Sequence, residues 1–216
     1  MGKTKFTIID YGIGNILSIK KAFEQNEVEI NISDKKQVIE ESSALILPGV
    51  GAFGSAISSI KKYELYETIS KVIDKGTPVL GICLGMQLFM TKSEEFGLYD
   101  GFNFIDGSVK KIQLDLKHKK FKLPHIGWRK IFGKEQIKNN LSYLKDVLEK
   151  KYYFIHSFEA KPLDKNIIIA RCKYYDTEIN AIIQKENIVG CQFHPEKSGK
   201  NGLNFIKSFI NFSKKN

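Results

Sequence analysis

Residues 77–92 read TPVLGICLGMQLFMTK, an apolar run that leads into a cysteine flanked by two glycines. TPVLGIC (77–83) has the unbroken apolar character of a buried parallel strand, and LGMQLFMTK (84–92) has the pattern of a helix. The G-x-C-x-G spacing around Cys83 matches a nucleophile elbow, a strand-to-helix turn so sharp that larger flanking residues would clash. We therefore expect an α/β fold in which Cys83 is a nucleophile at the start of a helix, where the thiolate is favoured.

The segments on either side extend this pattern. Strand and helix patterns alternate before it, whereas strand patterns rich in β-branched and aromatic residues predominate after it. This order predicts one α/β domain over 1–216, with a central, mainly parallel sheet flanked by helices and additional antiparallel strands. The expected strands are 6–10, 28–33, 44–48, 77–83, 102–112, 152–160, 166–175, 179–186 and 188–195, and the expected helices include 14–25, a segment ending near 62, 84–92 and 202–215.

The charge does not indicate a nucleic-acid partner. The 216 residues carry 34 Lys and Arg against 24 Asp and Glu, a net charge of +10, but the lysines are spread along the chain among acidic residues. The one dense cluster, Lys117-His118-Lys119-Lys120, has the pattern of a solvated turn, and no nucleic-acid-binding motif accompanies it.

Cysteine usage and hydropathy exclude further classes. Three widely spaced cysteines predict neither a disulfide framework nor a zinc site, and we expect no metal and no cofactor. Cys172 and Cys191 lie in apolar strand patterns and are expected to be core residues. No apolar segment is long enough to predict a membrane span, and the N-terminus lacks a signal-peptide pattern, so the expected location is the cytoplasm.

Two further strand ends carry residues that suit a cysteine nucleophile. His194-Pro195-Glu196 follows the strand pattern that ends at residue 193. The histidine can accept the thiol proton of Cys83, and the carboxylate can hold the imidazole in the correct tautomer. In parallel α/β sheets such groups meet beyond the carboxyl ends of the strands. We therefore expect Cys83, His194 and Glu196 to form one catalytic group.

The third strand end, PGVG (48–51), predicts an oxyanion hole. Glycines let backbone N–H groups point into a cleft, and we expect Gly51 and the N–H of Leu84 to be the donors. A simple turn or a phosphate loop are the alternatives, and PGVGAFG (48–54) lacks the lysine and hydroxyl of a Walker loop.

With these groups in place, the sequence resembles the class I (triad) glutamine amidotransferases. Within that class it resembles the HisH family, the glutaminase subunits of imidazole glycerol phosphate synthase, nearly from end to end. The motifs that carry the resemblance are DYGIGNILSI (10–19), LPGVGAFG (47–54), GICLGMQLF (81–89), SEEFG (93–97), LPHIGW (123–128), YYFIHSF (152–158) and GCQFHPEKSGKNGL (190–203).

The resemblance implies a flavodoxin-like α/β fold and hydrolysis of glutamine to glutamate and ammonia through a thioester on Cys83. It implies that Gln87, Glu95 and the backbone at Ser157 and Phe158 hold the glutamine.

It also implies a partner, a (β/α)8-barrel cyclase of the HisF type that receives the ammonia and makes imidazole glycerol phosphate and an aminoimidazole ribonucleotide (AICAR) in histidine biosynthesis. Trp128, Tyr153 and Lys197 match family positions near that interface in the heterodimer. The partner also has a physical reason, because ammonia is mostly protonated in water and needs a dry route to its acceptor.

Several residues depart from the family pattern. Arg129 stands where an asparagine is usual, Tyr175-Asp176 replaces a Tyr-Gly pair, and GLYDGFNFIDG (97–107) is longer and more aromatic than the usual loop. A paralogous amidotransferase subunit that supplies ammonia for amidination of a bacterial surface sugar is therefore an alternative. A catalytically silent binding subunit and a stand-alone cysteine hydrolase are two others, although the first would lack a triad member and the second would need no partner.

Overall fold

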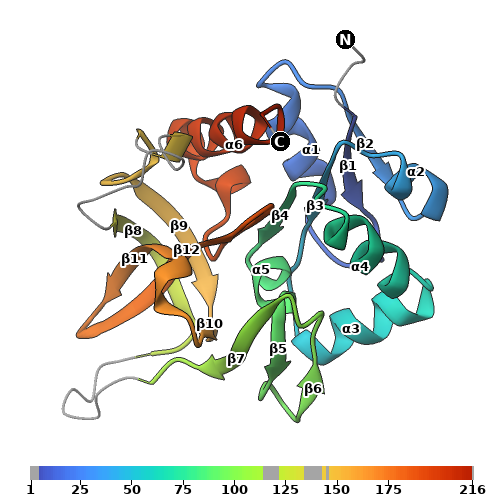
Figure 1. Cartoon of the computed structure of the whole chain (residues 1–216). Coiled ribbons are helices and arrows are strands. Elements are labelled where there is room, and N and C mark those ends of the chain that lie inside the picture. Colours follow the sequence, from blue (N-terminus) through green and yellow to red (C-terminus); the bar gives the residue numbers. More distant parts are fainter. Residues whose placement is uncertain (1–4, 114–121, 134–142, 145, 216) are drawn as a thin grey trace.

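The computed structural model describes residues 5–113, 122–133, 143–144 and 146–215, which form two sheets and the helices around them (Figure 1). The predicted turn at Lys117–Lys120 lies outside these residues. None of the helices in the described ranges is long and apolar enough to cross a bilayer.

The larger sheet has nine strands, and its first five in spatial order are parallel. Four of these strands are short apolar runs buried on both faces, as expected for parallel strands covered by helices, whereas the edge strand is only partly buried. In spatial order they are β2 (Ile30–Ser33), β1 (Phe6–Ile9), β3 (Ala44–Leu47), β4 (Val79–Ile82) and β13 (Ile188–Cys191).

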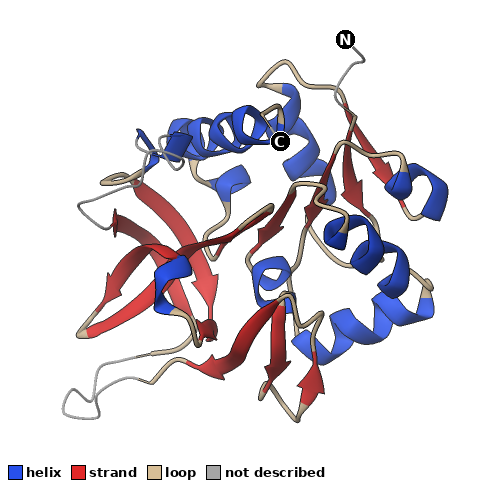
Figure 2. Ribbon diagram, viewed as in Figure 1, coloured by secondary structure: helices blue, strands red, loops and turns tan. Residues whose placement is uncertain are grey.

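Helices cover both faces of this parallel part (Figures 1 and 2). The helices α1 (Ile16–Glu24) and α6 (Gly199–Ser213) contribute Phe23 and Phe209 to one buried cluster. On the other face, α2 (Lys36–Glu40), α3 (Phe53–Lys62), α4 (Tyr66–Asp74) and α5 (Leu84–Leu88) contribute to a second cluster. Each long helix buries one apolar stripe, which explains its periodic sequence.

Beyond β13 the larger sheet continues with antiparallel strands. In spatial order these are β12 (Thr177–Lys185), β11 (Ile168–Tyr174), β8 (His125–Gly133) and β9 (Lys151–His156). The smaller sheet has the order β10 (Phe158–Pro162), β7 (Ile105–Lys111), β5 (Met90–Ser93) and β6 (Tyr99–Asp100). Two 3-10 turns, η2 (Lys165–Ile167) and η3 (Pro195–Lys197), complete the described elements. The predicted fold class is confirmed.

The predicted strand 188–195 already ends at Cys191, and two other predicted elements were wrong in extent. The predicted helix 84–92 ends at Leu88, because Met90–Ser93 forms β5, which pairs with β6 and β7. The predicted strand 152–160 is two strands, β9 and β10, which separate at Ser157 and enter different sheets. Both boundaries depend on which strands pair, and the pairing partners lie elsewhere in the sequence. Local periodicity therefore does not predict these boundaries.

Candidate functional site

Cys83 lies in a strained turn between β4 and α5. It has φ 54° and ψ −106°, a backbone conformation that side-chain-bearing residues rarely adopt and that costs on the order of 1–3 kcal/mol. A Cβ at Gly85 would lie 1.9 Å from the carbonyl oxygen of Leu47, and one at Gly81 would lie 2.5 Å from Cε2 of Phe89. The two glycines are therefore required by close approach of the surrounding chain, as expected for a nucleophile elbow.

The neighbouring strand fixes this turn. The N–H of Cys83 donates to the carbonyl of Cys191 over 2.7 Å, which extends the parallel pairing of β4 with β13. All three cysteines are buried and free, so Cys172 and Cys191 are core residues as predicted.

His194 and Glu196 form a buried pair just beyond the end of β13. The His194 Nδ1 atom lies 2.8 Å from Glu196 Oε1, and the two side chains are 2% and 1% exposed. Because the carboxylate accepts, Nδ1 donates, and Nε2 is left to act on a neighbouring group. Nε2 is buried, and His194 and Cys83 line the same pocket.

The charge of the cysteine controls the protonation of His194. Burial by itself lowers the pKa of this histidine, but the negative charge of Cys83, with hydrogen bonding to Cys83 and Glu196, raises it to about 10. The raised pKa favours the protonated imidazole at neutral pH. This is the protonation state that a cysteine nucleophile with a histidine acid requires.

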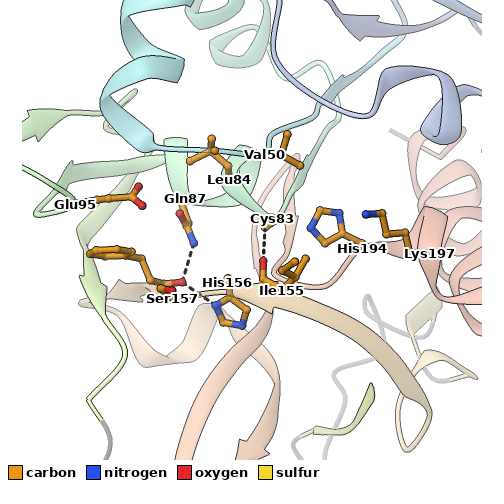
Figure 3. Close-up of a pocket in the computed structure, with 12 residues that line it drawn as sticks. Val50, Cys83, Leu84, Gln87, Glu95, Ile155, His156, Ser157, His194 and Lys197 are labelled. Carbon is orange, nitrogen blue, oxygen red and sulfur yellow. Dashed lines mark hydrogen bonds between the residues drawn. The ribbon is translucent and has the colours of Figure 1, made fainter. Parts of the chain in front are cut away.

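A pocket of about 220 Å³ opens beside Cys83 (Figure 3). It brings together nine of the residues that the sequence analysis named, drawn from four separate parts of the chain. Its lining consists of Val50, Gly51, Cys83, Leu84, Gln87, Glu95, Ile155, His156, Ser157, Phe158, His194 and Lys197. Sites for drug-sized ligands measure about 300–1,000 Å³, so this pocket suits a smaller molecule.

Gln87 is held by two buried groups and faces the pocket. Its Nε2 donates to the carbonyl of Phe158 over 2.9 Å and to Oε1 of Gln192 over 3.0 Å. Nε2 of Gln192 in turn donates to Sγ of Cys83 over 3.5 Å. A continuous set of amide hydrogen bonds thus joins the sulfur to the backbone at Phe158.

Glu95 reaches the pocket from the loop after β5. One carboxylate oxygen accepts from the N–H of Phe53, the first residue of α3, over 2.7 Å. Burial raises the pKa of Glu95, and the hydrogen bond from Phe53 opposes this by lowering it. Glu95 thus places an acidic side chain at the pocket, where a cationic ligand group can approach it.

The residues predicted to face a partner lie on adjoining elements. Trp128 on β8 is 48% exposed and packs edge-on against Tyr153 of β9, with ring centroids 6.0 Å apart. Lys197 in η3 lies beside His194 at the pocket (Figure 3). Trp128 and Tyr153 do not line the pocket but stand next to one another on paired strands.

The departures from the family pattern have structural roles. The Arg129 guanidinium lies 5.3 Å from the centre of the Tyr174 ring and donates to the carbonyl of Trp128 over 2.9 Å. Tyr175 carries a positive φ of 53° in the turn between β11 and β12. Arg129 thus adds a positive charge beside the exposed tryptophan.

Sequence reasoning missed Gln192 and His156. Gln192 stands two residues before His194. Alternate side chains of a strand point to the same side, so this spacing could have indicated that Gln192 lies on the side of His194. His156 lies in the YYFIHSF motif, directly before the predicted contacts at Ser157 and Phe158.

Comparisons with known proteins agree with this geometry. Residues 7–211 match the family model described as glutamine amidotransferase class-I. The chain is 41% identical over 209 residues to "Imidazole glycerol phosphate synthase subunit HisH" of Geobacter sulfurreducens, covering 95% of this chain and 98% of that one. It is also 41% identical over 207 residues to the protein of the same description from Prochlorococcus marinus subsp. pastoris, covering 95% and 97%.

Solved structures share the fold at low identity. A glutamine amidotransferase crystal structure superposes with a TM-score of 0.73 at 15% identity, covering 96% of this chain and 98% of that one. The structure of PurLQS from Thermotoga maritima gives a TM-score of 0.71 at 18% identity, covering 98% and 99%.

Proposed function

This chain belongs to the class-I glutamine amidotransferase family, among the HisH subunits of imidazole glycerol phosphate synthase, and on that premise we propose that its pocket hydrolyses glutamine at Cys83. The observation that carries the proposal is the placement of Cys83, in a strained elbow, in one pocket with a histidine that is already paired to a buried carboxylate. The reaction serves histidine biosynthesis by releasing ammonia for the synthase.

The chemistry follows from these three side chains. The Cys83 thiolate attacks the side-chain amide carbon of glutamine, and the carbonyl oxygen becomes an oxyanion. His194 gives its proton to the departing nitrogen, so ammonia leaves and a glutamyl thioester remains. His194, now neutral, takes a proton from water, and the hydroxide attacks the thioester to release glutamate. Glu196 keeps the imidazole oriented through both halves.

Gly51 and Leu84 are the proposed donors to the oxyanion. Both line the pocket, and Leu84 directly follows the nucleophile at the first position of α5. N–H groups aimed at the developing charge stabilise the transition state more than the ground state.

The other end of the pocket suits the amino-acid portion of glutamine. Glu95 supplies a carboxylate for the α-ammonium group, while Gln87 and the backbone at Ser157 and Phe158 supply amide groups. These roles agree with the small volume of the pocket.

A separate subunit of the HisF type is the proposed acceptor of the ammonia. Trp128, Tyr153 and Lys197 would contact it, because they lie together beside the pocket on β8, β9 and η3. Lys197 and Arg129 give this face a positive charge that an acidic surface would complement. The cytoplasm, expected from the sequence, is the corresponding proposed location.

Replacing Cys83 separates the two halves of the synthase reaction. We expect the complex of a Cys83→Ala chain with the cyclase of the same organism to lose glutamine hydrolysis, by a factor of roughly 10⁶. The same complex should keep synthesis with ammonium salt as nitrogen source, because the acceptor site lies on the partner. Release of glutamate and formation of imidazole glycerol phosphate are the two measurements.

The wild-type chain is the control, assayed alone and with the cyclase, with and without the nucleotide ligand of the cyclase. Glutamine turnover by the Cys83→Ala complex would show that another group is the nucleophile. Glutaminase activity that does not respond to the cyclase would point instead to the surface-sugar paralogue and its different partner.

A further inference from the structure

A pair of buried histidines adjoins the pocket and takes no part in the proposed chemistry. Nδ1 of His156 lies 2.8 Å from the carbonyl oxygen of Phe158, and Nε2 of His156 lies 3.0 Å from Nδ1 of His125. The two rings form a tilted edge contact with centroids 5.0 Å apart. Figure 3 shows His156 below Gln87, with dashed lines from both side chains to the same backbone oxygen.

The hydrogen-bond pattern fixes the tautomers of the pair when both rings are neutral. A carbonyl oxygen can only accept, so Nδ1 of His156 carries a proton, and in the neutral ring its Nε2 carries a lone pair. That lone pair requires a donor, so Nδ1 of His125 carries a proton as well. When both rings are neutral, each therefore carries its proton on Nδ1, and Nε2 of His125 is then an acceptor with no partner among the described residues.

The surroundings keep both rings neutral. His125 is fully buried, with its ring centroid 5.0 Å from that of Phe154 and 4.1 Å from that of Tyr174. Burial, then the charges of His156 and Arg129, lower the pKa of His125 to about 3. Burial lowers the pKa of His156 to about 4, helped by His194 and opposed by the bond to Phe158.

An apolar residue at position 125 would carry no unpaired polar atom of its own, but it would leave Nε2 of His156 without its donor. A buried acceptor with no partner costs on the order of 1–3 kcal/mol. A histidine is therefore expected at a core position only where its other ring nitrogen is needed. Here the other atom is the donor that sets the tautomer of His156.

The shared acceptor lies at a sensitive point of the pocket. The carbonyl of Phe158 accepts from His156 and also from Nε2 of Gln87 over 2.9 Å. It lies where the chain leaves β9 for β10, next to the peptide proposed to hold glutamine. Two donors from different elements thus fix the orientation of one peptide group.

We propose that His125 and His156 are positioning residues for the glutamine site. The neutral pair holds the Phe158–Glu159 peptide group, and with it the adjoining backbone at Ser157 and Phe158, at the orientation that glutamine requires, and it does so through the Nδ1–H of His156. This proposal rests on the proposed function. It also links the site to the partner-facing strands, because His125 pairs with His156 in the same β8–β9 ladder in which Trp128 pairs with Tyr153.

Two substitutions at His125 test the pair. His125→Phe keeps an aromatic ring against Phe154 and Tyr174 but removes the donor, whereas His125→Asn restores an N–H close to the position of Nδ1. With the wild-type partner subunit and saturating nucleotide, we expect His125→Phe to raise the KM for glutamine roughly tenfold with kcat within a factor of about three. His125→Asn should recover most of that loss.

A packing change without loss of the donor is the matched control. Phe154→Leu disturbs the ring that stacks on His125 and should lower Tm while leaving the KM for glutamine within about twofold of the wild type. An equal rise in KM for Phe154→Leu and His125→Phe would overturn the proposal, since packing alone would then explain both. Failure of His125→Asn to restore KM would overturn it as well.

Nitrogen NMR of the imidazole rings gives a readout that needs no substrate. We expect both rings of the free wild-type chain to be neutral at pH 7 with the proton on Nδ1, and the Nε2 resonance of His156 to shift in His125→Phe because that nitrogen loses its hydrogen-bond donor. A wild-type His156 protonated at Nε2 would overturn the proposal. Absence of glutamine turnover by the wild-type complex would instead contradict the proposed function, so the two failures are distinguishable.

Discussion

Glu196 acts on the proposed nucleophile only through His194. One carboxylate oxygen accepts from Nδ1 of that histidine, and the other, Oε2, is buried without a partner among the described residues. The carboxylate therefore orients the ring and balances the charge of the imidazolium, but it does not reach the reacting atoms.

Replacing this carboxylate should reduce turnover less than replacing the other two triad residues. We expect Glu196→Gln to lower kcat of the complex by roughly 10⁴-fold, and Cys83→Ala or His194→Ala by roughly 10⁶-fold. An amide in this position can donate to Nδ1 and select the wrong tautomer. Steady-state glutamate release with the partner present is the measurement, and equal losses for all three variants would contradict an orienting role.

At the residue scale, the sequence predicts the triad but not the residues that contact the proposed site from distant parts of the chain. The G-x-C-x-G spacing and the HPE turn predict a triad of Cys83, His194 and Glu196 because each lies within a short motif. Gln192 contacts Cys83 across 109 positions of sequence, and His125 contacts His156 across 31. Such pairs depend on strand order, which a single sequence does not give.

Helix α3 begins beside the pocket, and a pocket residue stabilises its first turn. The N–H of its first residue, Phe53, donates to Glu95, a residue from the loop after β5. The first N–H groups of a helix lack partners within the helix, and a carboxylate at that end is favoured by the helix dipole. A pocket residue thus also stabilises an element of the fold.

Removing this carboxylate should destabilise the free chain. We expect Glu95→Ala to lower the free energy of unfolding by about 1 kcal/mol and Glu95→Gln by less, because the amide oxygen can still accept. Urea denaturation of the isolated chain measures both. Glu94→Ala is the control, since Glu94 pairs with Lys110 at the surface and such pairs contribute about 0–1 kcal/mol. Identical stability of Glu95→Ala and wild type would contradict the capping role.

Elements with strong periodicity were the ones that could be predicted. The buried strands β3 and β4 and the helices α3 and α6 lie where the apolar patterns placed them. Helix α2 has five residues, too few to show a period, and was not predicted. The boundaries of α5 and β5 and the separation of β9 from β10 arise from pairing with distant strands.

The buried histidine pair should make the stability of the whole chain depend on pH. An unfolded histidine titrates near 6.5, whereas burial lowers the folded pKa to about 3 for His125 and to about 4 for His156. Between these values the unfolded chain binds protons that the folded pair does not, so acid favours unfolding. The contribution of the pair is complete above pH 6.5 and is lost as the pH falls toward 4.

Comparison with a variant isolates this effect from other groups. Each histidine contributes a slope of about 1.4 kcal/mol per pH unit in that window, so His125→Phe should have a shallower dependence than wild type between pH 4 and 6.5. Denaturation by urea at several pH values measures the difference. His194 affects the free energy of unfolding in another pH range. Because its pKa is raised in the folded chain, its stabilising contribution is complete below pH 6.5 and is lost as the pH rises toward 10. Equal slopes for both chains would contradict a neutral buried pair.

At the scale of the molecule, the alternation of strands and helices in the first half predicted a parallel sheet with helices on both faces. The sequence did not predict that four antiparallel strands would extend the same sheet, nor that a second sheet would form. These features depend on which strands become neighbours, and the apolar patterns of β8, β9 and β11 are compatible with several orders.

The separation of β9 and β10 at Ser157 has a consequence for how this protein can change over evolution. A single run of backbone from Lys151 to Pro162 sets the register of both sheets, with His156 opposite His125 on one side and Phe158 opposite Lys111 on the other. One inserted or deleted residue would slip a ladder and turn its inward side chains outward. The length of this run is therefore fixed, and divergence here must proceed by substitution alone.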